Sequence, residues 1–388
     1  MKNIAIVVVA YNRVKSLKRL LISLKSASYN GVNVPLIISI DKSESNEVAE
    51  FAHAFEWPFG EKEVIEHPEN LGLRKHVLFC GNLTKNYDAV IVLEDDIYVS
   101  KYFYNYVYQT IEKYDSCDFI AGISLYTHLW NVGANRPFTP LNNGFDAYFL
   151  QYAQSWGQAW TKRMWSQFYE WYLKSESSWN EKVNLPNNVL KWPDSSWLKY
   201  YISYTTKTNR YFVYPYISLT TNFTDAGTHN KVSNTSFQVP LLSYEIEQYK
   251  LPDFTANSLK YDVYFEQESM VVDFGIPKGD ICIDLYGYKN NENNQRYWLT
   301  TKLLDYKIIK EYALQLKPHE LNVINNLVGK GIYLYDTSYS SKKQNSKKIN
   351  LQNVSLIRYD VRALDTRSLI SLLKYELKAA IQKRLRIK

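Results

Sequence analysis

Hydrophobic positions in the first part of the chain follow two alternating patterns. Residues 3–10 form a continuous apolar, β-branched run, which is typical of a strand buried on both faces. Apolar residues then recur at helical spacing from Val14 to Leu24. Strands that alternate with such helices predict an α/β fold with a mostly parallel central sheet and helices on both faces. Further strands are expected at 35–40, 63–67, 89–93 and 119–124, and further helices at 46–55, 73–84 and 102–113.

The pattern changes after residue 235, where a small accessory α/β region is expected at 236–365. It contains no recognisable catalytic constellation. Its predicted strands are 261–264, 281–286, 331–335 and 356–359, its predicted helices are 303–316 and 319–327, and a Ser/Lys-rich loop is predicted at 338–348.

The last segment, 366–388, combines an apolar helical face with basic residues. From residue 374 onward six Lys and Arg face one Glu, a net charge of +5 out of +7 for the chain. Such a helix could lie on an anionic membrane surface or pack on its own protein, and both alternatives stay open. Because the excess charge is confined to this tail, we expect no nucleic-acid partner. The apolar positions are Leu369, Leu372, Leu373, Leu377, Ala380, Ile381 and Leu385.

The amino-acid composition also indicates the cellular compartment of the protein. Cys80, Cys117 and Cys282 have no metal-ligand spacing, and three cysteines cannot all pair, so a reducing cytosol is favoured. No apolar run approaches the roughly 18 residues of a membrane span. We therefore expect a cytoplasmic protein, peripheral at the inner face of the cell membrane. The 34 Tyr and 10 Trp suit both a large core and stacking on sugar rings.

Polar side chains follow each of the first four predicted strands. They are Tyr11 to Arg13, Asp41, residues 70–76, and the triplet Glu94-Asp95-Asp96. Ligands bind at the carboxyl ends of strands in such sheets. Three adjacent carboxylates repel one another unless a cation neutralises them, so the triplet predicts a divalent-cation site. The alternative is that Asp95 or Asp96 caps the following helix.

Missing motifs narrow the chemistry. The sequence has no GxxxxGK[ST], GxGxxG or GxSxG, and its six histidines show no paired spacing. This disfavours ATPases, dinucleotide oxidoreductases, serine hydrolases and zinc hydrolases. A cation held by carboxylates can instead bind a diphosphate and stabilise it as a leaving group.

Taken in order, these segments resemble the GT-A class of nucleotide-sugar glycosyltransferases, most closely the branch typified by N-acetylglucosaminyltransferase I. The resemblance implies a GT-A domain at 1–235, with nucleotide-sugar binding in 1–125 and the acceptor side in 126–235. It covers about residues 1–230 and rests on Tyr11-Asn12-Arg13, 37–41, 73–76, 92–96, 155–160 and 192–197.

What this resemblance implies is an inverting hexosyl- or N-acetylhexosaminyltransferase that uses Mn²⁺ or Mg²⁺. Asp96 would touch the metal, and Asp41 would accept a hydrogen bond from the uracil of a UDP-linked donor. His229 lies in a stretch similar to the family's closing loop, although an ordinary turn is an alternative. The remaining donor-binding positions are Tyr11, Arg13, Arg74, His76, Glu94 and Asp95.

The resemblance also implies a general base. The family places a carboxylate in a Trp-Asp-Asp-Trp segment; here the matching stretch is Trp192-Pro193-Asp194-Ser195-Ser196-Trp197, so Asp194 is the candidate. Its alternative role is that of a helix N-cap. Trp156, Trp160, Trp192 and Trp197 could form an acceptor platform or belong to the core.

Two other classes of protein remain open. A nucleotidyltransferase should show a Gly-rich basic loop after the first strand, where Tyr11 to Val14 has no glycine. A non-catalytic carbohydrate-binding protein gives no reason for the acidic triplet. The expected partners of a transferase are a nucleotide-sugar donor and a glycan or lipid-linked glycan acceptor, as in the synthesis of a surface polysaccharide.

Overall fold

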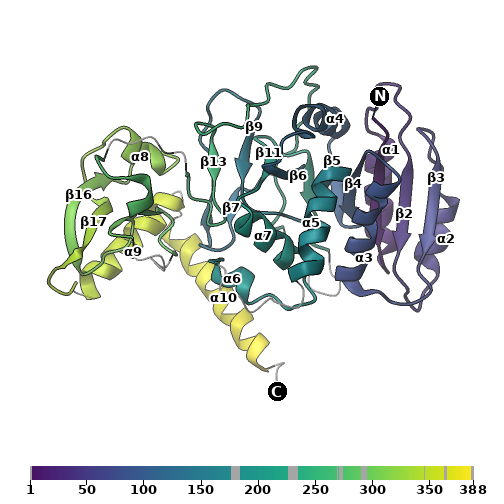
Figure 1. Ribbon diagram of the computed structural model, residues 1–388. Coiled ribbons are helices and arrows are strands. Elements are labelled where there is room, and N and C mark those ends of the chain that lie inside the picture. The colour runs from purple at the N-terminus through teal and green to yellow at the C-terminus, as the bar shows by residue number, and fades with distance from the viewer. Residues whose placement is uncertain are drawn as a thin grey trace. The chain divides into compact units, whose positions relative to one another are not determined.

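The computed structural model describes residues 2–175, 184–225, 235–268, 270, 274–289, 295–344, 346–361 and 365–385. The chain forms two compact units (Figure 1). The first comprises Met1–Val271 and Tyr288–Glu292, and the second comprises Val272–Gly287 and Asn293–Lys388.

A nine-stranded sheet forms the centre of the first unit, in the order β13-β9-β11-β6-β10-β4-β1-β2-β3. Strands β4, β1, β2 and β3 are parallel neighbours, whereas β10 runs antiparallel to β4 and β6. The predicted α/β class with a mostly parallel sheet is therefore confirmed. The strands are β1 (Ile4–Ala10), β2 (Leu36–Ile40), β3 (Lys62–Glu66), β4 (Ala89–Glu94), β6 (Ile120–Ser124), β9 (Ala147–Leu150), β10 (Gln158–Thr161), β11 (Tyr211–Pro215) and β13 (Lys260–Tyr261).

Helices cover both faces of this sheet because the strand order reverses. The chain moves outward from β1 to β3 and then returns past β1 to β4. Right-handed crossovers therefore place α1 and α2 on one face and α3 on the other, where α3 and α5 both contact α7. The helices are α1 (Val14–Lys25), α2 (Glu47–Ala54), α3 (Gly72–Asn82), η1 (Leu83–Lys85), α4 (Phe103–Tyr114), α5 (Lys162–Ser175), α6 (Asn187–Leu190) and α7 (Trp197–Lys207).

A short strand separates the acidic triplet from the next helix. Strand β5 (Ile97–Val99) pairs antiparallel with β12 (Thr220–Asn222), and α4 begins only at Phe103 with Tyr102 at its N-cap. The alternative that Asp95 or Asp96 caps this helix is therefore wrong. Another two-stranded pair joins β7 (Trp130–Asn131) to β8 (Arg136–Pro137).

The second unit contains a four-stranded sheet, β14-β15-β17-β16. Two of our predictions here are wrong: residues 306–313 form a strand within the predicted helix 303–316, and residues 356–359 lie in helix α9. Pairing of β16 with β17 overrides the helical spacing of its side chains. The elements are η3 (Lys278–Asp280), β14 (Ile281–Asp284), β15 (Tyr297–Thr300), β16 (Tyr306–Ala313), α8 (Glu320–Ile324), β17 (Gly331–Ser340), α9 (Ser346–Asp360) and α10 (Thr366–Leu385).

In the described part of the chain, no helix combines the length and the hydropathy that a membrane span requires.

The core of the first unit contains a histidine enclosed by aromatic rings. His128 is 3% exposed, and its ring centroid lies 5.3 Å from that of Tyr126 and 5.3 Å from that of Phe265. Its Nε2 has no hydrogen-bond partner among the described residues. Burial lowers the pKa of His128 to about 3, so the imidazole is neutral in the folded protein.

This pKa predicts an acid-sensitive fold. The unfolded chain protonates His128 below about pH 6.5, whereas the folded chain does not until about pH 3, so stability falls as the pH drops through that interval. At low pH the chain loses free energy of unfolding, and we expect His128→Phe to reduce this loss by up to about 1.4 kcal/mol for each pH unit below 6.5. Urea unfolding at a series of pH values measures the slope. Tyr152→Phe, in the same cluster, should change the free energy of unfolding but not its dependence on pH. Equal slopes for His128→Phe and the unmodified chain would contradict the prediction.

Candidate active site

The point where the strand order reverses lies between β1 and β4. These two strands pair in parallel with Val9 opposite Glu94, so their carboxyl ends lie side by side. Arg13, which follows β1, donates from Nη1 to Asp96 Oδ2 at 3.2 Å and from Nε to Asp95 Oδ2 at 3.3 Å. Its Nη2 also pairs with Asp95 Oδ1. The structure thus brings together Arg13, Asp95 and Asp96, and in parallel α/β sheets this is the position of the ligand crevice.

The crevice carries more negative charge than its arginine can neutralise. Burial, together with Asp96 and Asp95, raises the pKa of Glu94 well above its usual range. Burial also raises the pKa of Asp95 to about 6, although Arg13 acts in the opposite direction. At Arg13, burial opposes the charge, but Asp95 and Asp96 outweigh it and raise the pKa. One guanidinium facing three carboxylates favours the entry of a further cation.

Asn222, at the end of β12, fixes the orientation of Asp96. Its Nδ2 donates to Asp96 Oδ1 at 3.1 Å, and its Oδ1 accepts from the backbone N–H of Thr224 at 2.6 Å. The backbone N–H of Phe223 donates to the carbonyl of Asp96 at 3.0 Å. Sequence reasoning missed Asn222, because a single asparagine 126 positions from its partner gives no pattern.

The segment after β12 is also attached to α1. Asp225 accepts a hydrogen bond from Ser16 Oγ at 2.7 Å and pairs with Arg19, which lies 3.8 Å from the centroid of the Phe223 ring. These contacts hold the chain beside α1 directly before residues 226–234. The predicted donor residue His229 lies in that stretch, outside the described residues.

Asp41 follows β2 and holds the beginning of α3. Its Oδ1 accepts from the backbone N–H of Leu71 at 2.7 Å and its Oδ2 from that of Gly72 at 3.0 Å. The N–H of Lys42 donates to Oδ1 at 2.9 Å. A carboxylate at this position stabilises a helix N-terminus. Each oxygen can accept more than one bond, so the predicted uracil contact remains compatible with this arrangement.

The other predicted donor residues differ in their surroundings. His76 is 2% exposed, and its Nε2 lies 2.8 Å from Ser39 Oγ in the interior. Burial, and then His67, lowers the pKa of His76 to about 4. Arg74 donates to the hydroxyl of Tyr200 at 3.0 Å and thereby links α3 to α7, and Tyr11 is half-buried directly after β1.

Asp194 is an exposed carboxylate in front of α7. Its side chain is 77% exposed, and its Oδ1 lies 3.1 Å from the Nζ of Lys199, which also donates to the carbonyl of Trp192 at 2.9 Å. The N-cap residue of α7 is Ser196. The alternative that Asp194 is the N-cap is therefore wrong.

The four tryptophans fall into two groups. Trp160 and Trp197 are 0% and 2% exposed and pack edge to face at 5.9 Å in the core. Trp156 and Trp192 are half-buried. The ring of Trp156 lies 4.6 Å from that of Phe237 and 4.7 Å from that of Tyr126. Only the half-buried pair can present a ring face to a sugar.

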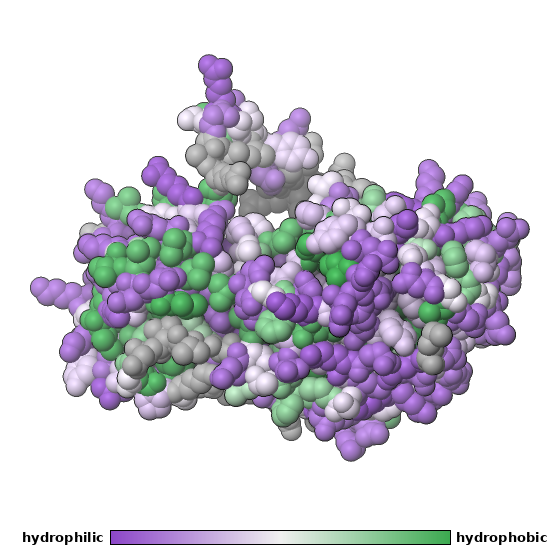
Figure 2. Space-filling view, turned by 90° about the horizontal axis from the view of Figure 1, so that it is seen from above, coloured by the Kyte–Doolittle hydropathy of each residue, from purple (hydrophilic) through white to green (hydrophobic). Residues whose placement is uncertain are grey.

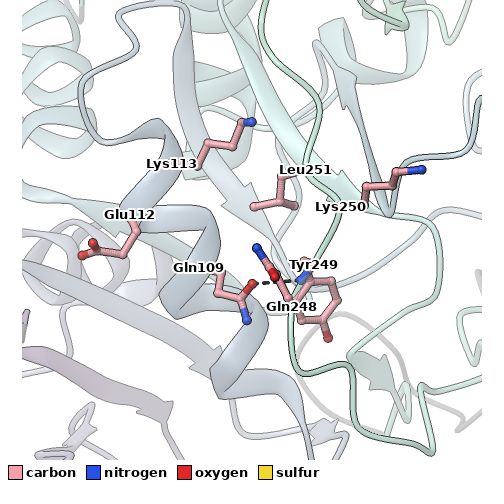
Figure 3. Close-up of a pocket in the computed structure, with 7 residues that line it drawn as sticks. All are labelled: Gln109, Glu112, Lys113, Gln248, Tyr249, Lys250 and Leu251. Carbon is pink, nitrogen blue, oxygen red and sulfur yellow. Dashed lines mark hydrogen bonds between the residues drawn. The ribbon is translucent and has the colours of Figure 1, made fainter.

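A surface groove in the described part of the chain lies elsewhere. It measures 760 Å³ and is formed by α4 and residues 248–251, where Gln109 accepts a hydrogen bond from the N–H of Tyr249 at 2.9 Å (Figure 3). The groove contains none of the residues that the sequence predicts for the site.

The donor set of the crevice suits a hard cation that is only partly held by protein. Among the described residues, no three His, Cys, Asp or Glu side chains converge as a complete metal cage. Mg²⁺ and similar cations commonly use one or two carboxylates, with phosphate oxygens and water completing the coordination. Asp96, with its carboxylate oriented by Asn222, fits that role.

Part of the chain is similar to a known protein family. Residues 5–165 match the family described as Glycosyl transferase family 2. No curated protein matches the sequence. Solved structures with partial likeness include a mannosyltransferase, PcManGT from Pyrobaculum calidifontis, in complex with GDP-Man and Mn²⁺ (10% identity, 42% of this chain and 45% of that chain, TM-score 0.30). Another is S. aureus TarS 1-349 in complex with UDP (12% identity, 55% and 57%, TM-score 0.35).

These structural likenesses span about half the length of each solved chain, and at such TM-scores they carry no functional conclusion. The sheet topology itself is consistent with the GT-A fold. The branch typified by N-acetylglucosaminyltransferase I has no support beyond the sequence resemblance. Residues 5–165, which include Arg13, Asp41 and the acidic triplet, are similar to glycosyl transferase family 2.

Proposed function

We propose that this protein is an inverting glycosyltransferase that moves a hexosyl or N-acetylhexosaminyl group from a UDP-linked donor to a hydroxyl of a glycan or lipid-linked glycan. One observation carries the proposal. Arg13 pairs with Asp95 and Asp96, directly after Glu94, at the carboxyl ends of β1 and β4, inside the region that matches glycosyl transferase family 2.

Different residues of the crevice would contact different parts of the donor. Arg13 can exchange a carboxylate partner for a diphosphate oxygen, because its guanidinium forms the same paired hydrogen bonds with both. Asp41 offers its remaining acceptor capacity to the uracil N–H. Tyr11 follows the neighbouring strand, since Ala10 pairs with Ile40. Asp96 would hold Mn²⁺ or Mg²⁺, with Asp95 toward the donor. A bound cation would neutralise the charge that develops on the departing diphosphate.

Asp194 is the proposed general base. Lys199 occupies Oδ1, which leaves Oδ2 free to take the proton from the acceptor hydroxyl as that oxygen attacks the sugar carbon. The leaving UDP departs from the opposite side of the carbon, which inverts its configuration. Trp156 and Trp192 are the proposed acceptor platform.

The proposed acceptor lies at an anionic membrane surface, which α10 contacts. The apolar residues Leu369, Leu373, Leu377 and Ile381 of this helix are 51%, 61%, 55% and 58% exposed. Exposed apolar positions flanked by Lys374 and Lys378 suit a helix that lies in the interface.

If Asp96 holds the metal, Asp96→Asn should abolish most of the metal dependence of UDP binding. We expect a loss larger than the roughly 10- to 100-fold that removal of an outer-sphere partner costs a metal site. Isothermal titration of UDP with Mn²⁺ and with a chelator measures it. Asp88→Asn, an exposed carboxylate before the same strand, is the matched control. Full metal dependence in Asp96→Asn would reject the assignment.

Removal of the base should affect turnover and spare donor affinity. Asp194→Asn keeps the shape of an exposed side chain, so we expect an unchanged melting temperature, unchanged UDP binding and a rate about 10²- to 10⁴-fold lower. Ser195→Ala leaves the carboxylate in place and should retain the rate. A fully active Asp194→Asn would show that another group accepts the proton, without disproving glycosyl transfer.

Deletion of residues 369–388 should weaken binding to anionic vesicles. Basic residues near such a surface contribute about 1 kcal/mol each, so the loss should be large at low salt and smaller at high salt. Co-sedimentation with vesicles measures the bound fraction, and activity on a soluble acceptor should survive. Unchanged binding after the deletion would leave α10 without a role at the membrane.

A further inference from the structure

Helix α9 turns an apolar stripe away from its own sheet. Gln352 and Tyr359 lie on one face of the helix and attach it to the rest of the second unit. Gln352 Nε2 donates to the carbonyls of Thr301 at 3.0 Å and Gly331 at 2.9 Å. The Tyr359 hydroxyl donates to the carbonyl of Leu316 at 2.6 Å.

On the remaining side, Leu351, Val354 and Ile357 are 60%, 46% and 62% exposed. Their spacing of three residues places them along one line of the helix. No residue of α9 is fully buried. A helix that only covered its sheet would carry its apolar residues on the inner face instead.

Basic residues surround this stripe. Lys347 and Arg358 lie within α9, and Lys342 and Lys343 precede it. Residues 342–388 contain thirteen Lys and Arg against three Asp and Glu, a net charge of +10. Because the whole chain has +7, the first 341 residues have a net charge of −3. The positive charge of the protein is therefore concentrated in the segment that exposes apolar helices.

Apolar side chains also reach the surface in other elements, such as Leu173 at 58% and Val328 at 83% exposed. The surface view shows apolar side chains scattered among polar ones (Figure 2). Exposed apolar residues alone therefore indicate no partner. The stripe of α9 differs because its apolar residues on the outer face of a helix are flanked by basic residues. Between residues 342 and 361 the sequence has no acid other than Asp360.

We propose that the outer face of α9 is a second membrane-binding element, which inserts Leu351, Val354 and Ile357 into an anionic lipid surface while Lys347 and Arg358 contact the headgroups. The inference extends the membrane partner proposed for α10 and rests on that part of the proposed function. Apolar insertion combined with basic residues is how interfacial helices bind. Two such elements strengthen binding more than either alone.

The test compares two double variants of the full chain. Val354→Asp with Ile357→Asp places two acids on the stripe. Asn353→Asp with Ser355→Asp adds the same charge to exposed positions of the same helix beside the stripe. All four side chains are exposed, so the melting temperature should stay unchanged in both. The probe is co-sedimentation with vesicles of phosphatidylglycerol and phosphatidylcholine in equal amounts, and with phosphatidylcholine alone.

We expect the stripe variant to bind the anionic vesicles at least about tenfold more weakly than the control, because only it loses apolar insertion. The difference should persist in chains that lack residues 369–388, which separates α9 from α10. Equal weakening in both variants would mean that charge alone matters, and no weakening in either would mean that α9 faces away from the lipid; each overturns the proposal.

A second copy of the chain is the competing occupant. Light scattering without vesicles would then show a dimer that the stripe variant dissociates and the control does not, and that result would overturn the proposal as well. Glycosyl transfer to a soluble acceptor is measured separately in each variant. Failure of the membrane inference and failure of the proposed transferase activity are thus distinguishable.

Discussion

The arrangement of the first unit depends on the meeting of Arg13 with the carboxylates that follow β4. Parallel pairing of β1 with β4 forces these groups together, since Val9 lies opposite Glu94. Three adjacent acids at the end of a buried strand would repel one another, and Arg13 offsets part of that cost. The remaining negative charge lies in a buried position, where charged groups interact more strongly than they do in water.

Around this centre, separate parts of the chain hold the carboxylates in position. Asn222 orients Asp96, Asp225 ties the same segment to Ser16 and Arg19, and the carboxylate of Asp41 holds the first turn of α3. Side chains that are fixed in this way before a ligand arrives need little rearrangement when it binds. Asp194 differs, because its side chain is 77% exposed and its contact is with Lys199. The base that we propose therefore lies at the surface of the protein.

The sequence predicts the first half of the fold well, for a physical reason. Residues 4–10 and 89–93 are apolar throughout because both faces of these strands are buried, and such runs are visible without a structure. The carboxyl ends of β1, β2 and β4 then locate Arg13, Asp41 and Asp96. Asn222 could not be found in this way, since its role depends on β12 pairing with β5 from a distant part of the chain. The second unit was predicted less well because β16 is an edge strand in which the adjacent Ile308 and Ile309 are both exposed, so its residues do not alternate between buried and exposed positions.

The contact between Asn222 and Asp96 has a consequence for how the polypeptide can be divided. A fragment ending at residue 165, where the family match ends, would keep Arg13, Asp41 and all three acids of the triplet. It would nevertheless remove β11 from the edge of β6, β12 from β5, and the amide that orients Asp96. The segment that carries the recognisable chemistry therefore lacks the partner of Asp96, and this carboxylate acquires its native orientation only when Asn222, well beyond the end of that segment, is in place.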